Sequence, residues 1–208
     1  MLNAMVDPDG AAKVAAACLR SGGLVVLPTE TVYGIAALAS DLSAVDELFI
    51  RKGRPAGRRV AVLVADFSQA QQLAVFDHRA AAVAGAWWPG PLTMVLPSVS
   101  GSAELTVGVR CPDHKLIRTI ASAVGPIATT SANRSGDLTP ADAEAAAASL
   151  GDGLLILDGG PCIGTPSTVV DLTADPAIIL REGAIGVADL IAAGLRMGPE
   201  SVDQGGGG

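Results

Sequence analysis

The sequence is poor in the residues on which several functional classes depend. Its 208 residues include one Tyr, three Phe and two Trp, too few rings for a good platform on which nucleic-acid bases would stack. The three cysteines, Cys18, Cys111 and Cys162, are widely separated and form no CxxC pair. An odd number of isolated cysteines favours neither a disulfide framework nor a zinc site. We therefore expect all three to be small core residues in a reducing compartment.

Positive charge is also scarce over the chain as a whole. The formal net charge is −7, which argues against binding of nucleic acid or anionic membrane across the whole surface. Any anion-binding site must therefore be local. One local concentration exists, because five of the fourteen basic residues lie within residues 51–59 with no acid among them. Taken alone, such a charge run is usually a solvated loop.

Targeting signals are missing as well. Asp7 and Asp9 stand where a signal peptide would need basic residues followed by an apolar run, and the apolar stretches are too short to span a bilayer. We therefore expect a cytoplasmic protein that does not associate with membranes. Half of the residues are apolar, enough for a substantial core. We expect one domain over residues 1–198 and a disordered tail over residues 199–208, which end in four glycines.

Several common catalytic motifs do not occur. The sequence has no G-x-S-x-G segment, which argues against a hydrolase with a serine nucleophile. It has neither a P-loop nor a G-x-G-x-x-G segment, so a bound nucleotide would need side-chain cations for its phosphates. His78 and His114 lack the spacing of metal ligands, and we expect both to be ordinary surface residues. The candidate cations for a phosphate site are Lys52, Arg54, Arg110 and Arg181.

The pattern of apolar residues predicts a mixture of strands and helices. Predicted strands lie at 24–27, 60–64, 92–96, 106–110, 127–130, 154–158, 167–172 and 177–181, and predicted helices at 9–21, 43–52, 67–75, 77–87, 113–124 and 141–149. Several late strands follow one another too closely for parallel crossovers, so hairpins must occur there. The sequence therefore predicts one α/β domain with a twisted mixed sheet.

Candidate caps mark the start of three of the predicted helices. Asp9 is expected to cap the helix over 9–21, and Ser43, three residues before Asp46, the helix over 43–52. Thr139 is expected to cap the helix over 141–149, with Pro140 at its first position.

Polar segments follow two of the predicted strands. Residues 29–34 follow the strand at 24–27, and residues 131–136 follow the strand at 127–130. In α/β folds, such strand ends are where ligands bind. Hydroxyl and amide groups that can orient a ligand belong to Thr29, Thr31, Ser131, Asn133, Ser167 and Thr168. Taken singly, each of these is more often a turn residue or a cap.

Six segments occur in a distinctive order along the chain. They are Pro28-Thr29-Glu30-Thr31-Val32-Tyr33-Gly34, Lys52-Gly53-Arg54-Pro55, Trp88-Pro89-Gly90-Pro91-Leu92-Thr93, Val109-Arg110-Cys111-Pro112, Ser131-Ala132-Asn133-Arg134-Ser135-Gly136 and Ser167-Thr168-Val169-Val170-Asp171. Together they resemble the YrdC/TsaC family over about residues 10–185. The resemblance is to the short form, because no room remains for the extra C-terminal domain of longer members. It implies a YrdC-like domain, a twisted mixed sheet with flanking helices around a basic concave cavity.

The resemblance also implies an activity. Members of the family are nucleotidyltransferases that make threonylcarbamoyl-AMP and pyrophosphate from L-threonine, bicarbonate and ATP, toward threonylcarbamoyladenosine in tRNA. The implied cofactor is Mg²⁺, which enters with ATP rather than on protein side chains. The implied downstream partners are tRNA-threonylcarbamoyl transferase proteins, and direct contact with tRNA is left open.

Family roles carry over to particular residues. The resemblance implies ATP contacts from Lys52, Arg54, Arg58, Thr106, Ser131, Asn133, Thr139 and Arg181, with Lys52 and Arg54 as the catalytic cations. It implies threonine contacts from Thr31, Arg110, Thr129 and Ser167, with Arg110 paired to the carboxylate. The positions taken from segments between the motifs are Arg58, Thr106, Thr129 and Thr139.

The chain departs from the family pattern at two places. It reads Arg58-Arg59-Val60 where many members read Lys-Pro-Leu or Asn-Pro-Leu, which leaves the path of that loop open but keeps its positive charge. It has Leu63 where some members place a histidine near threonine.

Two other functions remain open at this stage. The first is an RNA-binding module that uses a basic cavity without catalysis, with Tyr33 stacking on a base. Salt-sensitive tRNA binding without ATP consumption would favour it. The second is an enzyme of related fold that acts on a sugar phosphate or carbamoyl phosphate. Carbamoyl transfer usually appears in the family as one module of a much longer chain, so the length speaks against it.

Overall fold

A computed structural model describes residues 1–53, 60–100, 105–162 and 164–198. The helices in these residues are α1 (Pro8–Arg20), α2 (Leu42–Arg51), α3 (Phe67–Gln71), α4 (His78–Trp87), α5 (Lys115–Val124), α6 (Ala143–Leu150) and α7 (Val187–Ala192). The strands are β1 (Leu2–Asn3), β2 (Val25–Leu27), β3 (Gly34–Leu38), β4 (Ala61–Leu63), β5 (Leu92–Pro97), β6 (Thr106–Arg110), β7 (Ile127–Ser131), β8 (Leu155–Asp158), β9 (Thr168–Asp171) and β10 (Ile178–Arg181).

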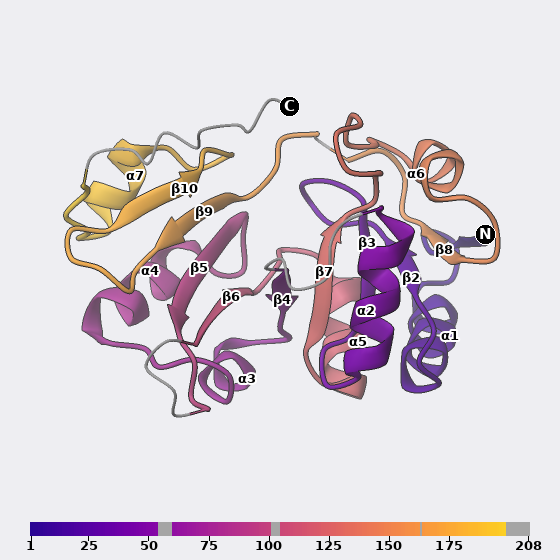
Figure 1. Ribbon diagram of the computed structural model, residues 1–208, viewed down its shortest axis with the longest axis horizontal. Coiled ribbons are helices and arrows are strands. Elements are labelled where there is room, and N and C mark those ends of the chain that lie inside the picture. The colour runs from indigo at the N-terminus through magenta and orange to yellow at the C-terminus, as the bar shows by residue number, and fades with distance from the viewer. Residues whose placement is uncertain (54–59, 101–104, 163, 199–208) are drawn as a thin grey trace.

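One twisted mixed sheet joins all of these strands (Figure 1). Its order is β1-β8-β2-β3-β7-β4-β6-β5-β9-β10. The sheet combines parallel pairs, such as β4 with β6 and β5 with β9, with antiparallel pairs, such as β3 with β7 and β5 with β6. The late strands β9 and β10 form an antiparallel pair, which confirms the expected hairpin. The predicted α/β class with a mixed sheet is confirmed.

The helices cover the two arms of the sheet differently. In the arm formed by β8, β2, β3 and β7, α1 and α5 pack in one core cluster, and α2 and α6 pack in a second cluster whose strand residues alternate with those of the first. Val25 and Leu27 of β2 belong to the first cluster, while Val26 belongs to the second. Strand β2 is therefore buried on both faces, as a continuous apolar strand requires.

The other arm, formed by β6, β5, β9 and β10, has one face in the core and one face toward a cavity. Along β5, Leu92, Met94 and Leu96 pack with α4 in the third core cluster. The residues between them, Thr93 and Val95, line the cavity. Because successive strand residues point to opposite faces, this alternation separates the hydrophobic core from the polar site.

Three helices are capped by aspartates that differ from the caps predicted from the sequence. The N-caps of α1, α2 and α6 are Asp7, Asp41 and Asp142, not the predicted Asp9, Ser43 and Thr139. Each aspartate lies directly before the first helical residue, and its carboxylate accepts the backbone N–H three residues further on. A short carboxylate side chain in that position satisfies a helix N–H that would otherwise lack a partner. The caps predicted at Asp9, Ser43 and Thr139 are therefore wrong.

Three elements were not predicted. β1 and α7 are only two and six residues long, too short for a periodic signal. β3 follows directly on the polar segment 29–33, and its residues Gly34–Leu38 are small and apolar without the enrichment in β-branched residues that marks a strand. No helix in the described part of the chain is long and apolar enough to cross a membrane.

The cysteines and histidines are placed as follows. All three cysteines are free thiols that pack in or against core clusters, as expected, and burial raises the pKa of Cys111 to about 11.

His78 is exposed at the start of α4. His114 is half-buried, its Nδ1 is buried without a hydrogen-bond partner among the described residues, and burial lowers its pKa. The expectation of an ordinary surface residue is therefore wrong for His114.

Candidate functional site

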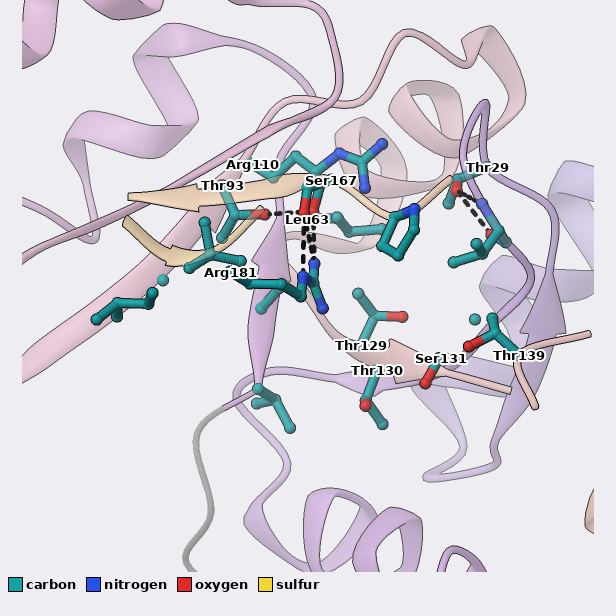
Figure 2. Close-up of a pocket in the computed structure, with 18 of the residues that line it drawn as sticks. Thr29, Leu63, Thr93, Arg110, Thr129, Thr130, Ser131, Thr139, Ser167 and Arg181 are labelled. Carbon is teal, nitrogen blue, oxygen red and sulfur yellow. Dashed lines mark hydrogen bonds between the residues drawn. The ribbon is translucent and has the colours of Figure 1, made fainter. Parts of the chain in front are cut away.

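A cavity of about 340 Å³ lies against the strands in the middle of the sheet. Its described lining comes from strands and from the loops next to them, and contains no helix residue. The polar side chains of the lining are Thr29, Thr93, Arg110, Thr129, Thr130, Ser131, Thr139, Ser167 and Arg181. Figure 2 shows Arg110, Thr93, Ser167 and Arg181 on one side of the cavity and Thr129, Thr130 and Ser131 on the opposite side, with Thr29 and Thr139 at the right of the view.

Small side chains form the floor between these groups. Thr129 of β7 pairs with Ala61 of β4, Ala61 pairs with Gly108 of β6, and Gly108 pairs with Val95 of β5. Paired residues of neighbouring strands point to the same face of a sheet. These four residues therefore point to the same face of the sheet, and because they are short they leave room for the cavity over that face.

Arg110 is held by three neighbours and still faces the cavity. Its Nε donates to the carbonyl oxygen of Gly90 at 3.2 Å, and its Nη2 donates to Thr31 Oγ1 at 3.1 Å. Nη2 also forms an ion pair with Glu30 Oε1 at 2.8 Å. Within the described part of the chain, Nη1 makes no hydrogen bond. The N–H groups of Nη1 can donate charge-assisted hydrogen bonds to a carboxylate or phosphate oxygen.

Arg181 brings a second cation to the same wall. Its Nε and Nη2 donate to the carbonyl oxygen of Ser167 at 3.1 and 2.8 Å, and Nη2 also reaches Ser167 Oγ at 2.9 Å. Thr93 Oγ1 completes the chain at 3.0 Å from Ser167 Oγ (Figure 2). Burial lowers the pKa of Arg181, and the like charge of Arg110 lowers it further. Two guanidinium groups that repel each other favour an anion between them.

Lys52 supports the opposite wall. It follows α2, its side chain is buried, and its Nζ donates to the carbonyl oxygen of Ser131. Ser131 Oγ is 3.4 Å from the same ammonium group. The backbone N–H of Ser135 returns a hydrogen bond to the Lys52 carbonyl at 3.0 Å. Two hydrogen bonds therefore connect the end of α2 to the loop after β7, and the Lys52 ammonium makes one of them.

The loop at 29–31 is fixed by hydrogen bonds from several directions. Thr29 Oγ1 accepts from the backbone N–H groups of Thr31 and Val32, at 3.2 and 3.1 Å, and lies 2.9 Å from Thr31 Oγ1. The backbone of Gly164 donates to the carbonyl oxygen of Thr31 at 2.9 Å. Thr31 is therefore held rigidly beside Arg110, which is the arrangement that a positioned ligand site requires.

The residues expected in the site fall into four groups. Arg110, Thr129, Ser131, Thr139, Ser167 and Arg181 line the cavity. Thr31 and Lys52 are buried one hydrogen bond behind it, against Arg110 and Ser131. Thr106 and Asn133 are not in the lining, and Arg54 and Arg58 lie outside the described residues. The geometry is therefore compatible with most of the expected roles, and the roles themselves stay predictions.

Thr106 and Asn133 occupy positions that explain their absence from the lining. Thr106 begins β6 and pairs with Pro97, on the face of Gly108 and Arg110 but beyond the cavity. Asn133 uses its Nδ2 to donate to the carbonyl oxygens of Arg134 and Asp137, at 2.9 and 2.8 Å. Its Oδ1 is buried without a partner among the described residues.

Sequence reasoning missed three polar residues of the site. Thr93 and Thr130 line the cavity directly, and Glu30 holds Arg110. Thr93 carried a signal, since it is a polar residue between Leu92 and Met94 in a strand that is otherwise apolar. Glu30 lies between two threonines in a polar segment, but nothing in the sequence pairs it with an arginine 80 positions later. Leu63 and Val60, from the two departures, contribute apolar lining.

Comparison with known proteins gives consistent results. A model of the Sua5/YciO/YrdC family, described as telomere recombination, matches residues 17–183. Curated proteins named threonylcarbamoyl-AMP synthase from Pyrococcus abyssi and Bacillus subtilis are both 40% identical to the chain, over 86% and 92% of its length and 55% and 58% of their own. A putative threonylcarbamoyl-AMP synthase of Mycobacterium tuberculosis is 41% identical over 82% of this chain and 83% of its own.

Solved structures agree with these relatives. The crystal structure of P. abyssi Sua5 complexed with L-threonine matches with a TM-score of 0.84 and 38% identity, covering 92% of this chain and 61% of that one. Escherichia coli YciO matches with a TM-score of 0.78 and 25% identity, covering 88% and 94%. The chain spans little more than half the length of the P. abyssi and B. subtilis relatives. By the extent of the family match and the level of identity, this chain belongs to the Sua5/YciO/YrdC family.

Proposed function

We propose that this chain is a threonylcarbamoyl-AMP synthase, which converts L-threonine, bicarbonate and ATP into threonylcarbamoyl-AMP and pyrophosphate. The observation that carries the proposal is Arg110. Its guanidinium is buried beside Thr31 and lines a cavity that a second cation, Arg181, also faces. A cavity of about 340 Å³ lined by two cations and several hydroxyl groups suits a small polar ligand.

In the first step, the threonine amine attacks the carbon of bicarbonate, a C–N bond forms and water is lost, which gives a carbamate. Arg110 binds the threonine carboxylate through Nη1, and Thr31 and Ser167 lie on the same side of the cavity. The chain contributes mainly position here, because holding the amine and bicarbonate together removes most of the entropic cost of their encounter.

In the second step, a carbamate oxygen attacks the α-phosphorus of ATP, and the bond from that phosphorus to the bridging oxygen of pyrophosphate breaks. Lys52 and Arg54, with Arg181 and the Ser131 hydroxyl, neutralise and orient the phosphates. Mg²⁺ bound to ATP is expected to share this charge. No protein nucleophile takes part, so the catalytic effect rests on fixed cations and donors.

The proposal extends to the cellular setting. The reaction takes place in the cytoplasm, and the acyl adenylate passes to tRNA-threonylcarbamoyl transferase proteins. Relatives that share 40% identity with this chain bear the name of this activity, which supports the assignment.

The alternative of an RNA-binding module is less well supported. Tyr33, the aromatic residue that would stack on a base, is fully buried. Its hydroxyl donates to the carbonyl oxygen of Gly160 at 2.7 Å and accepts from the backbone of Gly159 at 3.1 Å. A ring fixed in this way inside the protein cannot serve as a stacking surface.

The deciding experiment incubates the chain with the three substrates and looks for threonylcarbamoyl-AMP by mass spectrometry. We expect product and pyrophosphate only when threonine, bicarbonate and ATP are all present. Pyrophosphate release that does not depend on threonine would refute the proposal. Replacing bicarbonate with carbamoyl phosphate tests the related enzyme activity. Measuring tRNA binding at several salt concentrations without ATP tests the RNA-binding module.

Gly108 provides a test of the cavity that separates binding from folding. A Cβ at this position would meet Thr93 Cγ2, Val60 O and Val95 Cγ2 at 3.6 to 3.9 Å, which is ordinary contact. In Gly108→Val, the methyl groups extend into the cavity. We expect a loss of roughly tenfold or more in kcat/KM, because small displacements of reacting groups are costly.

The stability of Gly108→Val should be unchanged or higher, since glycine within a strand costs roughly 0.5–1 kcal/mol relative to alanine. Pyrophosphate release and thermal unfolding measure the two effects. Gly85→Ala is the matched control, because Gly85 is exposed on α4 with no atom near its missing Cβ. Full activity in Gly108→Val would show that ligands do not occupy this part of the cavity.

A further inference from the structure

Glu30 is an unexpected neighbour for an arginine that has to bind a carboxylate. Its Oε1 lies 2.8 Å from Arg110 Nη2 and also accepts the backbone N–H of Asp113 at 2.9 Å. The side chains of Arg110 and Glu30 are 6% and 17% exposed, so solvent screens the pair little. By charge alone, Glu30 weakens the attraction between Arg110 and any second carboxylate. Its presence therefore calls for another explanation.

The hydrogen-bond inventory of Arg110 supplies that explanation. A guanidinium has five N–H groups in a planar fork. The Nε–H is used by Gly90, and the two hydrogens of Nη2 are used by Thr31 and Glu30. Nη1 keeps both of its N–H groups, and Arg110 lines the cavity. Because Nε and Nη2 are occupied, Nη1 is the guanidinium nitrogen of Arg110 that the described residues leave available to a ligand.

The anchors of Arg110 come from segments that are far apart in the sequence. Gly90 lies before β5, Glu30 and Thr31 follow β2, and Asp113, which fixes Glu30, lies two residues before the start of α5. Three anchors that do not lie on one line prevent rotation of the guanidinium plane. Pre-organisation of this kind reduces the ordering cost that a ligand would otherwise meet on binding.

We infer that Glu30 is a positioning residue, which fixes the Arg110 guanidinium so that Nη1 is directed at the carboxylate of the substrate. The inference rests on the proposed function for the identity of that substrate. Glu30 acts through Arg110 and does not itself touch the reacting atoms. For binding of the substrate carboxylate, the fixed orientation of Arg110 contributes more than the negative charge of Glu30 takes away.

Two substitutions separate orientation from charge. Glu30→Gln keeps an acceptor for Arg110 and Asp113 and removes the charge, whereas Glu30→Ala removes both. We expect Glu30→Ala to weaken L-threonine binding about tenfold, as measured by calorimetry on the full chain, and Glu30→Gln to stay within about threefold of the original protein. The affinity for ATP should change less than about twofold in both. Glu47→Ala, which removes an exposed carboxylate paired with Arg51, controls for net charge.

Other roles of Glu30 give other results. If charge were its only effect, both variants would bind threonine more tightly than the original protein does. If Glu30 served only the stability of the fold, threonine and ATP binding would fall together with the melting temperature. Either result would overturn the inference.

A measurement without any ligand completes the test. In ¹⁵N spectra of arginine side chains, Arg110 should show separate Nη resonances, because its fork cannot rotate. In Glu30→Ala these resonances should broaden or merge, while those of Arg79, which is held by Asp77 and Asp175, should not change. Unchanged Arg110 signals in Glu30→Ala would refute the positioning role. If the Arg110 signals behaved as expected but the original protein did not bind threonine, only the proposed function would be refuted.

Discussion

Arg110→Lys is expected to lower kcat/KM for L-threonine by roughly 100-fold or more, chiefly through a higher KM, while the protein remains folded. Arg110 makes three anchoring contacts through Nε and Nη2 and keeps the N–H groups of Nη1 for a ligand. A lysine ammonium is a single point with three donors, so it cannot reach Gly90, Thr31 and Glu30 and also donate to a carboxylate. Pyrophosphate release at varied threonine concentration measures the effect.

Lysine is a better choice here than alanine. Arg110→Ala would leave Glu30 as a buried carboxylate without its cation, and breaking a buried ion pair typically costs about 3–5 kcal/mol of stability. Loss of activity would then reflect unfolding as readily as loss of recognition. Arg110→Lys keeps a positive charge beside Glu30. Arg79→Lys, in an ion pair with Asp77 and Asp175 away from the cavity, is the matched control. Near-normal KM for threonine in Arg110→Lys would contradict the assigned role.

Local sequence patterns predicted most of the helices and strands. In the predicted strand at 92–96, the structure places Leu92, Met94 and Leu96 in the core and Thr93 and Val95 at the cavity. Strand ends with polar residues also predicted where the site lies. The helix caps failed at a finer level, since several residues near each start are able to cap and the local backbone decides among them.

Contacts between distant segments could not be predicted from residue types. Glu30 and Arg110 are neither periodic nor close in sequence, and their ion pair exists only because the turn after β2 lies beside the end of β6. Asn133 is a second example, because its Nδ2 donates to the carbonyl oxygens of Arg134 and Asp137, while its expected role at the nucleotide stays a prediction. Side-chain direction in a loop depends on hydrogen bonds that a sequence pattern does not specify.

Lys52→Met is expected to reduce kcat by roughly 100-fold or more, with little change in KM for threonine. The Lys52 ammonium donates to the carbonyl oxygen of Ser131, next to the Ser131 hydroxyl that lines the cavity. In the proposed reaction, this is where negative charge moves from the α-phosphate onto pyrophosphate. A fixed cation there stabilises the transition state more than it stabilises bound threonine.

Methionine keeps most of the length of the lysine side chain and removes its charge, so the packing beneath Ser131 is largely preserved. The backbone hydrogen bond from Ser135 to the Lys52 carbonyl does not depend on the side chain and should hold the loop. Lys115→Met, on the exposed surface of α5, controls for the loss of a positive charge.

The two substitutions test different parts of one mechanism. Arg110→Lys should act through threonine recognition and Lys52→Met through the phosphoryl step, because Arg110 lines one wall of the cavity and Lys52 lies behind Ser131 of the opposite wall. Steady-state kinetics with each substrate varied, together with calorimetric binding of ATP and threonine, separates the two effects. If Lys52→Met raised KM for threonine and left kcat unchanged, the phosphates could not be bound at the Ser131 wall.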